Sequence, residues 1–146
     1  MLMRGSSTLT EGERELIATL VSQGNQCEFC TAAHTAAADA ILGERETAEI
    51  VKNDPDNAPV SEKMKHLLQI ARNVQADARS VSPDLVEKAR NAGASDMELH
   101  DTLLIAALFC LYNKYCRWPG KCNSHRPCFL RQAGWNFKKQ RIPAIG

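Results

Sequence analysis

Three residues within the stretch NQCEFCTAAH have types and spacing suited to chemistry. Cys27 and Cys30, the dithiol, are three positions apart, and His34 follows four positions later. On a helix, this spacing places all three side chains on one face. A thiolate in the first turn is stabilised by the positive end of the helix dipole, and His34 can take the thiol proton. The pattern therefore suits a dithiol that attacks a peroxide and then closes a disulfide.

Two other interpretations of the dithiol stay open. A Cys-x-x-Cys pair also begins many zinc sites, and such a module would use the dithiol and His34 plus a cysteine of the C-terminal tail. Structural zinc takes four ligands, and the spacing of Cys122, His125 and Cys128 fits no common zinc pattern well. The third interpretation is that the two cysteines only pack.

Glu15 belongs to the expected helix before the dithiol. Its carboxylate could orient His34, completing a chain of nucleophile, base and orienting group. Taken alone, Glu15 is more typical of a solvated helix charge. His66 and His100 are interpreted as half-exposed structural residues, and Cys110 as a small hydrophobic residue of the core.

The elements that must position these residues are all predicted to be helical. No useful length of sequence alternates at period two, whereas capping residues, apolar stripes and terminal glycines mark six helices. Four of these helices are expected to begin just after a capping residue, namely Thr10, Ser61, Ser82 or Ser95. The other two are expected to begin near residue 27 and at residue 44. The last and most apolar helix is expected from Met97 to about Tyr115. The sequence thus predicts an all-α domain.

Composition limits the class of protein. The chain has 146 residues, enough for one domain, and 44% of them are apolar. A net charge of +1 argues against nucleic acid or an anionic membrane as the main partner. The first residues do not resemble a signal peptide, and the longest apolar run, 103–112, is too short to span a bilayer. We therefore expect a cytoplasmic protein, where six cysteines favour catalysis or metal binding over a disulfide framework.

The stretch LTEGERELIATLVSQGNQCEFCTAAHTAAADAILG resembles the carboxymuconolactone decarboxylase superfamily, in its alkylhydroperoxidase-D-like, peroxidase-related branch. That branch has a Glu, eleven residues, Cys-x-x-Cys, three residues and a His. Here these are Glu15, Cys27, Cys30 and His34, with the spacing fully met. The segment LLIAALFCLYNKY also resembles the family's apolar helix ending in Asn-Arg, although Lys114 replaces the Arg. The resemblance covers about residues 4–115.

The resemblance implies a single helical domain that assembles as trimers or hexamers and reduces organic hydroperoxides with a lipoamide- or thioredoxin-like dithiol donor, without metal or other cofactor. By this likeness Cys30 would be the peroxidatic thiolate. Cys27, nearer the helix start and expected to be more exposed, would be the resolving thiol and the entry point of the reductant. Glu15 and His34 would relay protons. The alternative is a non-catalytic or truncated member with a structural role.

Three departures from the family bear on these expectations. Some members carry a second His between the cysteines, where this chain has Phe29. Relatives usually have another helical segment before the match, so the core over 1–115 is expected to be N-terminally shortened. Decarboxylase members lack the dithiol, which disfavours a lactone substrate.

The tail, residues 116–146, does not resemble the family. It holds Cys116, Cys122 and Cys128 and has no clean periodicity. Codons can be chosen for the tail that, read one nucleotide later, encode an acidic turn and an amphipathic helix like the family's C-terminus. One interpretation is therefore a frameshifted tail, in which these cysteines and His125 have no designed role. The other is a genuine divergent tail.

Overall fold

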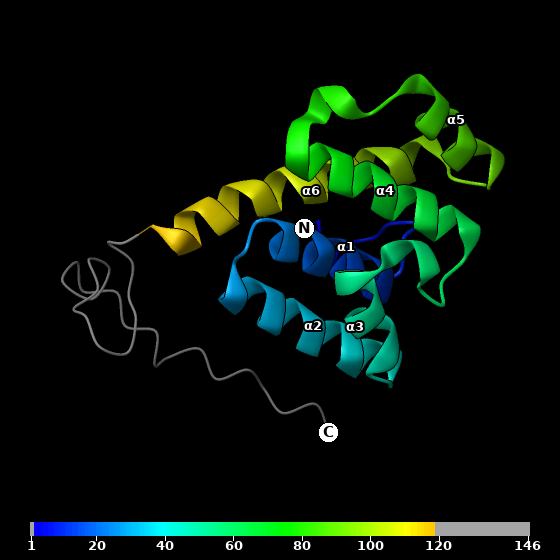
Figure 1. Cartoon of the computed structure of the whole chain (residues 1–146). Helices are drawn as coiled ribbons and strands as arrows, with labels where there is room; N and C mark the ends of the chain where they lie inside the picture. Colours follow the sequence, from blue (N-terminus) through cyan, green and yellow to red (C-terminus); the bar gives the residue numbers. More distant parts are fainter. Residues whose placement is uncertain (1, 119–146) are drawn as a thin grey trace, which may run out of the picture. The chain divides into compact units, whose positions relative to one another are not determined.

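A computed structural model describes residues 2–118 of the chain. Within them lie six α-helices and two short 3-10 helices, and no strand occurs there (Figure 1). The helices are α1 (Glu11–Gly24), α2 (Glu28–Leu42), α3 (Glu46–Asn53), η1 (Pro55–Asn57), α4 (Glu62–Asp77), η2 (Ala78–Ser80), α5 (Pro83–Asn91) and α6 (Asp96–Arg117). The predicted all-α class and its six helices are confirmed.

The chain divides into two units, Met1–Cys116 and Arg117–Gly146. Nearly all of the second unit lies outside the described residues, including Cys122, His125 and Cys128. The interpretation of the tail therefore stays a prediction, and the helical unit is described by itself below.

Capping boxes begin two of the helices, as the sequence predicts. The Thr10 hydroxyl accepts the N–H of Glu13 at 3.2 Å, and the Glu13 carboxylate accepts the N–H of Thr10 at 2.8 Å. Ser95 and Glu98 repeat this arrangement at the start of α6. Each box satisfies N–H groups that the first turn leaves without partners.

Helix α1 lies in the middle of the unit, with α2 and α3 on one side and α4 on the other (Figure 1). The apolar stripe expected on α1 is buried, and it packs in one core with the apolar side of α4. The largest buried side chains of this core are Leu16, Ile17, Met64, Leu67, Leu68 and Ile70. Because α1 is covered on both sides, polar groups on it can also be removed from water.

The turn between α1 and α2 is a Schellman motif. The N–H of Cys27 donates to the carbonyl of Ser22 at 3.0 Å, and that of Gln26 donates to Gln23 at 2.9 Å. Gln26 has φ 55°, the left-handed conformation that this position usually gives to glycine. Cys27 is also the N-cap residue of α2. One residue thus ends the first helix and begins the second.

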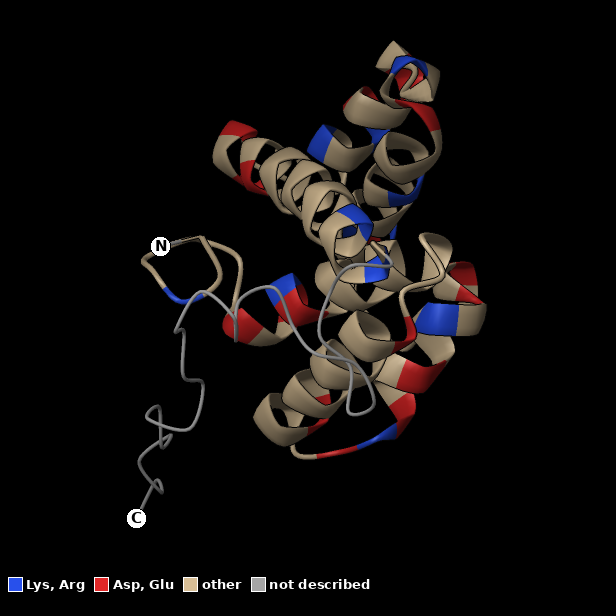
Figure 2. Cartoon of the chain, turned by 90° about the vertical axis from the view of Figure 1, so that its left-hand side faces the viewer, with Lys and Arg blue, Asp and Glu red and all other residues tan. Residues whose placement is uncertain are grey.

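Helix α6 has one buried side and one apolar exposed side. Ile105, Ala106, Phe109 and Asn113 are buried. Acidic residues lie near its start and basic residues near its end, which complements the helix dipole, and its middle is uncharged (Figure 2). Among residues 2–118, no helix combines the length and apolar character needed to cross a membrane.

Candidate redox site

The dithiol lies at the start of α2, as predicted. Cys27 is the N-cap residue and Cys30 is in the first turn, and both are reduced. Cys27 is 2% exposed and Cys30 is 6% exposed. The expectation that Cys27 is the more accessible thiol is therefore wrong. The Schellman turn is the reason, because its hydrogen bond to Ser22 keeps Cys27 against the end of α1.

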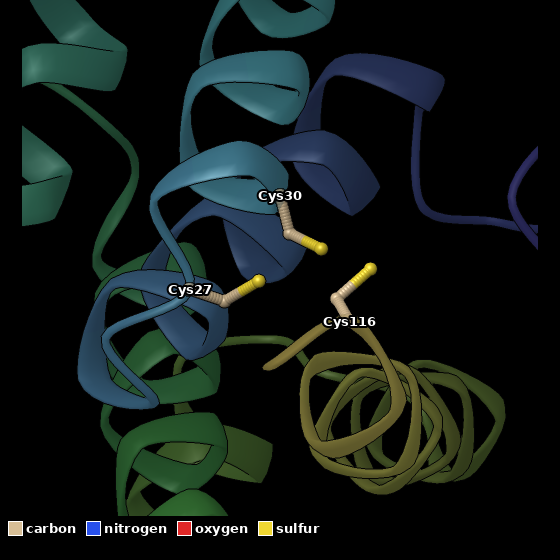
Figure 3. A group of neighbouring side chains, drawn as sticks. All are labelled: Cys27, Cys30 and Cys116. Atoms are coloured by element: carbon tan, nitrogen blue, oxygen red, sulfur yellow. The ribbon is translucent and has the colours of Figure 1, made fainter. Parts of the chain in front are cut away.

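A third thiol, which the peroxidase interpretation did not assign to the site, joins the pair. The sulfur atoms of Cys27, Cys30 and Cys116 all lie within 4.8 Å of one another. Figure 3 shows the three side chains converging, two from the start of α2 and one from the end of α6. The sequence did not indicate which tail cysteine would reach the dithiol, since the residues are far apart along the chain and Cys116 is in a segment unlike the family.

Burial sets the protonation of Cys30. Removal from water raises the pKa of its thiol to about 12, and contacts with the thiols of Cys27 and Cys116 act in the same direction. A hydrogen bond from Asn113 acts in the opposite direction without overcoming them. The expectation of a thiolate stabilised by the helix start is therefore wrong for this chain, because loss of solvation outweighs the favourable dipole. Cys30 rests as a thiol at neutral pH.

Asn113 connects α6 to the dithiol. Its side chain is fully buried, donates to the Ser22 hydroxyl at 3.2 Å and accepts from the Asn25 amide at 2.9 Å. Hydrogen bonding to Cys30 favours the thiolate. The sequence marked Asn113 only as part of the family likeness, although an asparagine in a very apolar helix is a signal that the side chain has fixed partners.

Glu15 and His34 form the contact that the sequence suggested. The Oε2 atom of Glu15 lies 2.6 Å from Nδ1 of His34, joining α1 to α2. Glu15 is 1% exposed, so its interpretation as a solvated charge is wrong. Burial acts to raise the pKa of Glu15, but hydrogen bonds from His34 and Arg4 outweigh it and leave that pKa below its ordinary value. The carboxylate is therefore charged at neutral pH.

Arg4 is a member of this cluster that sequence reasoning missed. Its Nη2 atom lies 2.5 Å from Oε1 of Glu15. Arg14, 3% exposed, holds the preceding segment against α1 by donating to the carbonyls of Leu2 and Gly5, both at 2.9 Å. The N-terminal segment thereby brings a positive charge to the buried carboxylate. No local pattern in the sequence predicts this arrangement.

His34 is fixed from two sides. Glu15 holds Nδ1, and the ring lies edge-to-face on Phe109 with the centroids 4.5 Å apart. When neutral His34 donates Nδ1–H to Glu15, its Nε2 atom is left as the acceptor. His34 lies one helical turn beyond Cys30, but the hydrogen bonds found for it in residues 2–118 do not include either thiol. Proton transfer between them stays a prediction.

In the described part of the chain, one group of three or more metal-ligating side chains has its ligand atoms close enough to share an ion, namely Cys27, Cys30 and Cys116. Three thiolates could hold a thiophilic ion such as zinc and leave a fourth position open. His34 does not belong to this group. Cys116 thus supplies the tail cysteine that the zinc interpretation expected, but the histidine of that interpretation is not a ligand candidate here.

Other surface features lie apart from this cluster. A pocket of about 550 Å³ is lined by residues near the opposite end of α2, including Asp39 and Arg45.

Phe29 is 70% exposed, so it does not fill the space between the buried thiols. Among the remaining histidines and cysteines, His66 and Cys110 are half-buried and His100 is exposed.

Comparisons with known proteins agree with the helical fold. Residues 1–72 match the sequence model of the carboxymuconolactone decarboxylase family. A search of curated proteins gave no match.

Two solved structures are similar to the chain. An uncharacterized peroxidase-related protein from Silicibacter sp. TM1040 is 28% identical, with a TM-score of 0.73. An uncharacterized peroxidase-related protein from Ralstonia eutropha JMP134, described as an alkylhydroperoxidase AhpD core, is 30% identical, with a TM-score of 0.74. Each match covers 78% of this chain and 60% of the other. Sequence and fold thus both relate the chain to the carboxymuconolactone decarboxylase superfamily and its alkylhydroperoxidase-D-like proteins.

Proposed function

We propose that the chain is a thiol-dependent hydroperoxide reductase. The observation that carries the proposal is a buried dithiol on the same helix as a histidine whose ring is fixed by a buried carboxylate. Such a set supplies a nucleophile, a resolving thiol, a base and its orienting group. The similarity to peroxidase-related proteins supports the same class of reaction.

The chemistry begins with proton removal, because Cys30 rests as a thiol. In the proposed step His34 accepts this proton, and Glu15 stabilises the imidazolium that results. The Cys30 thiolate attacks the distal peroxide oxygen, the O–O bond breaks, and the leaving alkoxide takes the proton to become an alcohol. Cys30 is now a sulfenic acid. The Cys27 thiol condenses with it, which forms a disulfide and releases water.

The partners follow from this cycle. The oxidant is an organic hydroperoxide, and a lipoamide- or thioredoxin-like dithiol returns two electrons to the disulfide. We propose a cytoplasmic location, where such donors occur, and no nucleic acid or membrane partner.

We also propose that the protein is a homo-oligomer, a trimer or hexamer. Large apolar side chains on the outer side of α6 support assembly, because contiguous exposed apolar surface marks interaction sites. These side chains are Met97, Leu103, Leu104, Leu111, Tyr112 and Tyr115.

Stoichiometric oxidation of the reduced protein tests the function. One equivalent of cumene hydroperoxide should produce one equivalent of alcohol and a Cys27–Cys30 disulfide, located by mass spectrometry after alkylation. Cys30→Ser should abolish alcohol formation, whereas Cys110→Ser on α6 should not. A folded protein that leaves both thiols free with peroxide would show a structural role instead. Zinc bound stoichiometrically in the protein as purified would favour a metal module.

A further inference from the structure

Burial of the dithiol creates a difficulty for its reduction. Thiol–disulfide exchange needs the attacking sulfur to approach a sulfur of the disulfide directly. Cys27 and Cys30 are 2% and 6% exposed, so a dithiol protein has little access to either. A small peroxide can enter a site that a protein reductant cannot. The cycle therefore needs a path by which the disulfide reaches the surface.

Cys116 is placed to provide that path. Its sulfur lies within 4.8 Å of both buried sulfurs, on a different helix (Figure 3). It is half-buried, and hence more exposed than either of them. The contact of its thiol with Cys30 is direct enough to influence the ionisation of that residue.

We propose that Cys116 is a third redox thiol, which takes the disulfide from the buried pair and presents it to the reductant. This inference rests on the proposed disulfide cycle. The Cys116 thiolate attacks the sulfur of Cys30 in the Cys27–Cys30 disulfide. The old S–S bond breaks, a Cys30–Cys116 disulfide forms, and Cys27 leaves as a thiolate that takes the proton lost by Cys116.

Reduction then occurs at the accessible sulfur. One thiolate of an external dithiol attacks Cys116, which releases Cys30 and leaves a mixed disulfide between Cys116 and the donor. The second donor thiol attacks its own neighbouring sulfur, closes the donor disulfide and frees Cys116. The donor loses two electrons, and all three protein thiols are reduced again. A thiol in this position can react in this way whatever the origin of the tail.

Cys110 offers a matched comparison on the same helix. It is also half-buried, but its sulfur lies 3.5 Å from the Asn25 amide and it is not a member of the three-sulfur group. Replacing Cys110 therefore removes a thiol of similar exposure from α6 without removing the proposed path.

A trapping experiment tests the assignment. The full chain, with Cys122→Ser and Cys128→Ser to remove the other tail thiols, is oxidised either with cumene hydroperoxide or with diamide. It is then mixed with a thioredoxin whose second active-site cysteine is serine, which stays joined to the sulfur that it attacks. We expect the mixed disulfide on Cys116. Cys116→Ser should slow trapping by on the order of tenfold, as expected where access limits exchange, whereas Cys110→Ser should not.

The proposal would be overturned if the protein that retains Cys27, Cys30 and Cys116 formed its mixed disulfide on Cys27 or Cys30. It would also be overturned if the oxidised protein formed no mixed disulfide with thioredoxin. This mapping needs no change at Cys116, so a folding defect of the variant cannot obscure it. Diamide separates the two proposals: adducts on Cys116 after diamide but no reaction with peroxide would sustain the relay and reject the peroxidase. If peroxide produced the Cys27–Cys30 disulfide but thioredoxin adducts formed only on Cys27, the peroxidase would be sustained and the relay through Cys116 rejected.

Discussion

Glu15 Oε2 lies 2.6 Å from His34 Nδ1 in a place where the carboxylate is almost completely removed from water. A buried charge is costly unless it is paired. Here His34 and Arg4 supply the partners, one for each carboxylate oxygen. The same contact therefore supports the fold and fixes the histidine ring.

Replacement of Glu15 should destabilise the protein in a pH-dependent manner. The pKa of Glu15 is lower in the folded protein than its ordinary value of 4.5, so the charged carboxylate stabilises the fold. This stabilisation is present above pH 4.5 and is lost as the pH falls through the pKa of the folded state. Glu15→Gln should lower the free energy of unfolding at pH 7 by about 1–3 kcal/mol. Urea unfolding at pH 7, 5 and 3 should show this difference shrinking towards acid pH. Glu11→Gln, on the exposed side of α1, should change stability little, and an equal loss at every pH would contradict the argument.

Alkylation of Cys30 should accelerate steadily with pH. Its pKa is raised to about 12, so the thiolate fraction still increases throughout the range from pH 6 to about 10, roughly tenfold per unit as for any thiol well below its pKa. Iodoacetamide labelling, followed peptide by peptide with mass spectrometry, measures this. A plateau near pH 7 would instead show a thiolate stabilised at neutral pH.

Two substitutions on α6 should change the rate of Cys30 alkylation in opposite directions. The Cys116 thiol raises the pKa of Cys30 and Asn113 lowers it. Cys116→Ala should therefore speed alkylation of Cys30 at pH 8, and Asn113→Ala should slow it. Circular dichroism must show that both variants are folded, since Asn113 is fully buried. Changes of the same sign in both variants would mean that accessibility, rather than ionisation, controls the rate.

Two left-handed positions should respond oppositely to substitution. Gln26 has φ 55° and Gly43 has φ 74°, each just after a helix. Gln26→Gly should raise the free energy of unfolding by about 0.5–1 kcal/mol, because a side chain is disfavoured in this conformation. Gly43→Ala should lower it by about 1 kcal/mol. The space around Gly43 is open, so a larger loss would indicate a contact beyond the backbone preference. Thermal or urea unfolding gives both values.

Charge on the outer side of α6 should prevent assembly if that side forms the oligomer interface. Leu111 is 63% exposed and Leu104 is 44% exposed. Leu104→Glu with Leu111→Glu should convert an oligomer to monomers in sedimentation velocity, because two charges would be buried without partners. Lys88→Glu on α5 serves as the control. An assembly that survives the double change uses another surface.

Local sequence rules predicted the helices because their signals lie within a few residues. The capping boxes at Thr10 and Ser95 and the glycine after α2 act through neighbouring backbone groups, and the family pattern of Glu15 and His34 gave a contact that the fold contains. The environment of the dithiol was not predictable in this way. Its burial depends on how α6 and the turn at Gln26 cover it. Because burial removes water from Cys30, the pKa of its thiol is raised, whereas the helix start alone was expected to lower it.

The hydrogen bonds of Asn113 to Ser22 and Asn25 also determine how the site opens. The amide of Cys27, bonded to Ser22 O, lies at the junction of the ends of α1 and α6 with the beginning of α2. For this amide to exchange with solvent deuterium, the end of α6 must leave the turn or the turn itself must unwind. Its exchange rate thus reports the opening of the redox centre, separately from exchange in the core of α1 and α4.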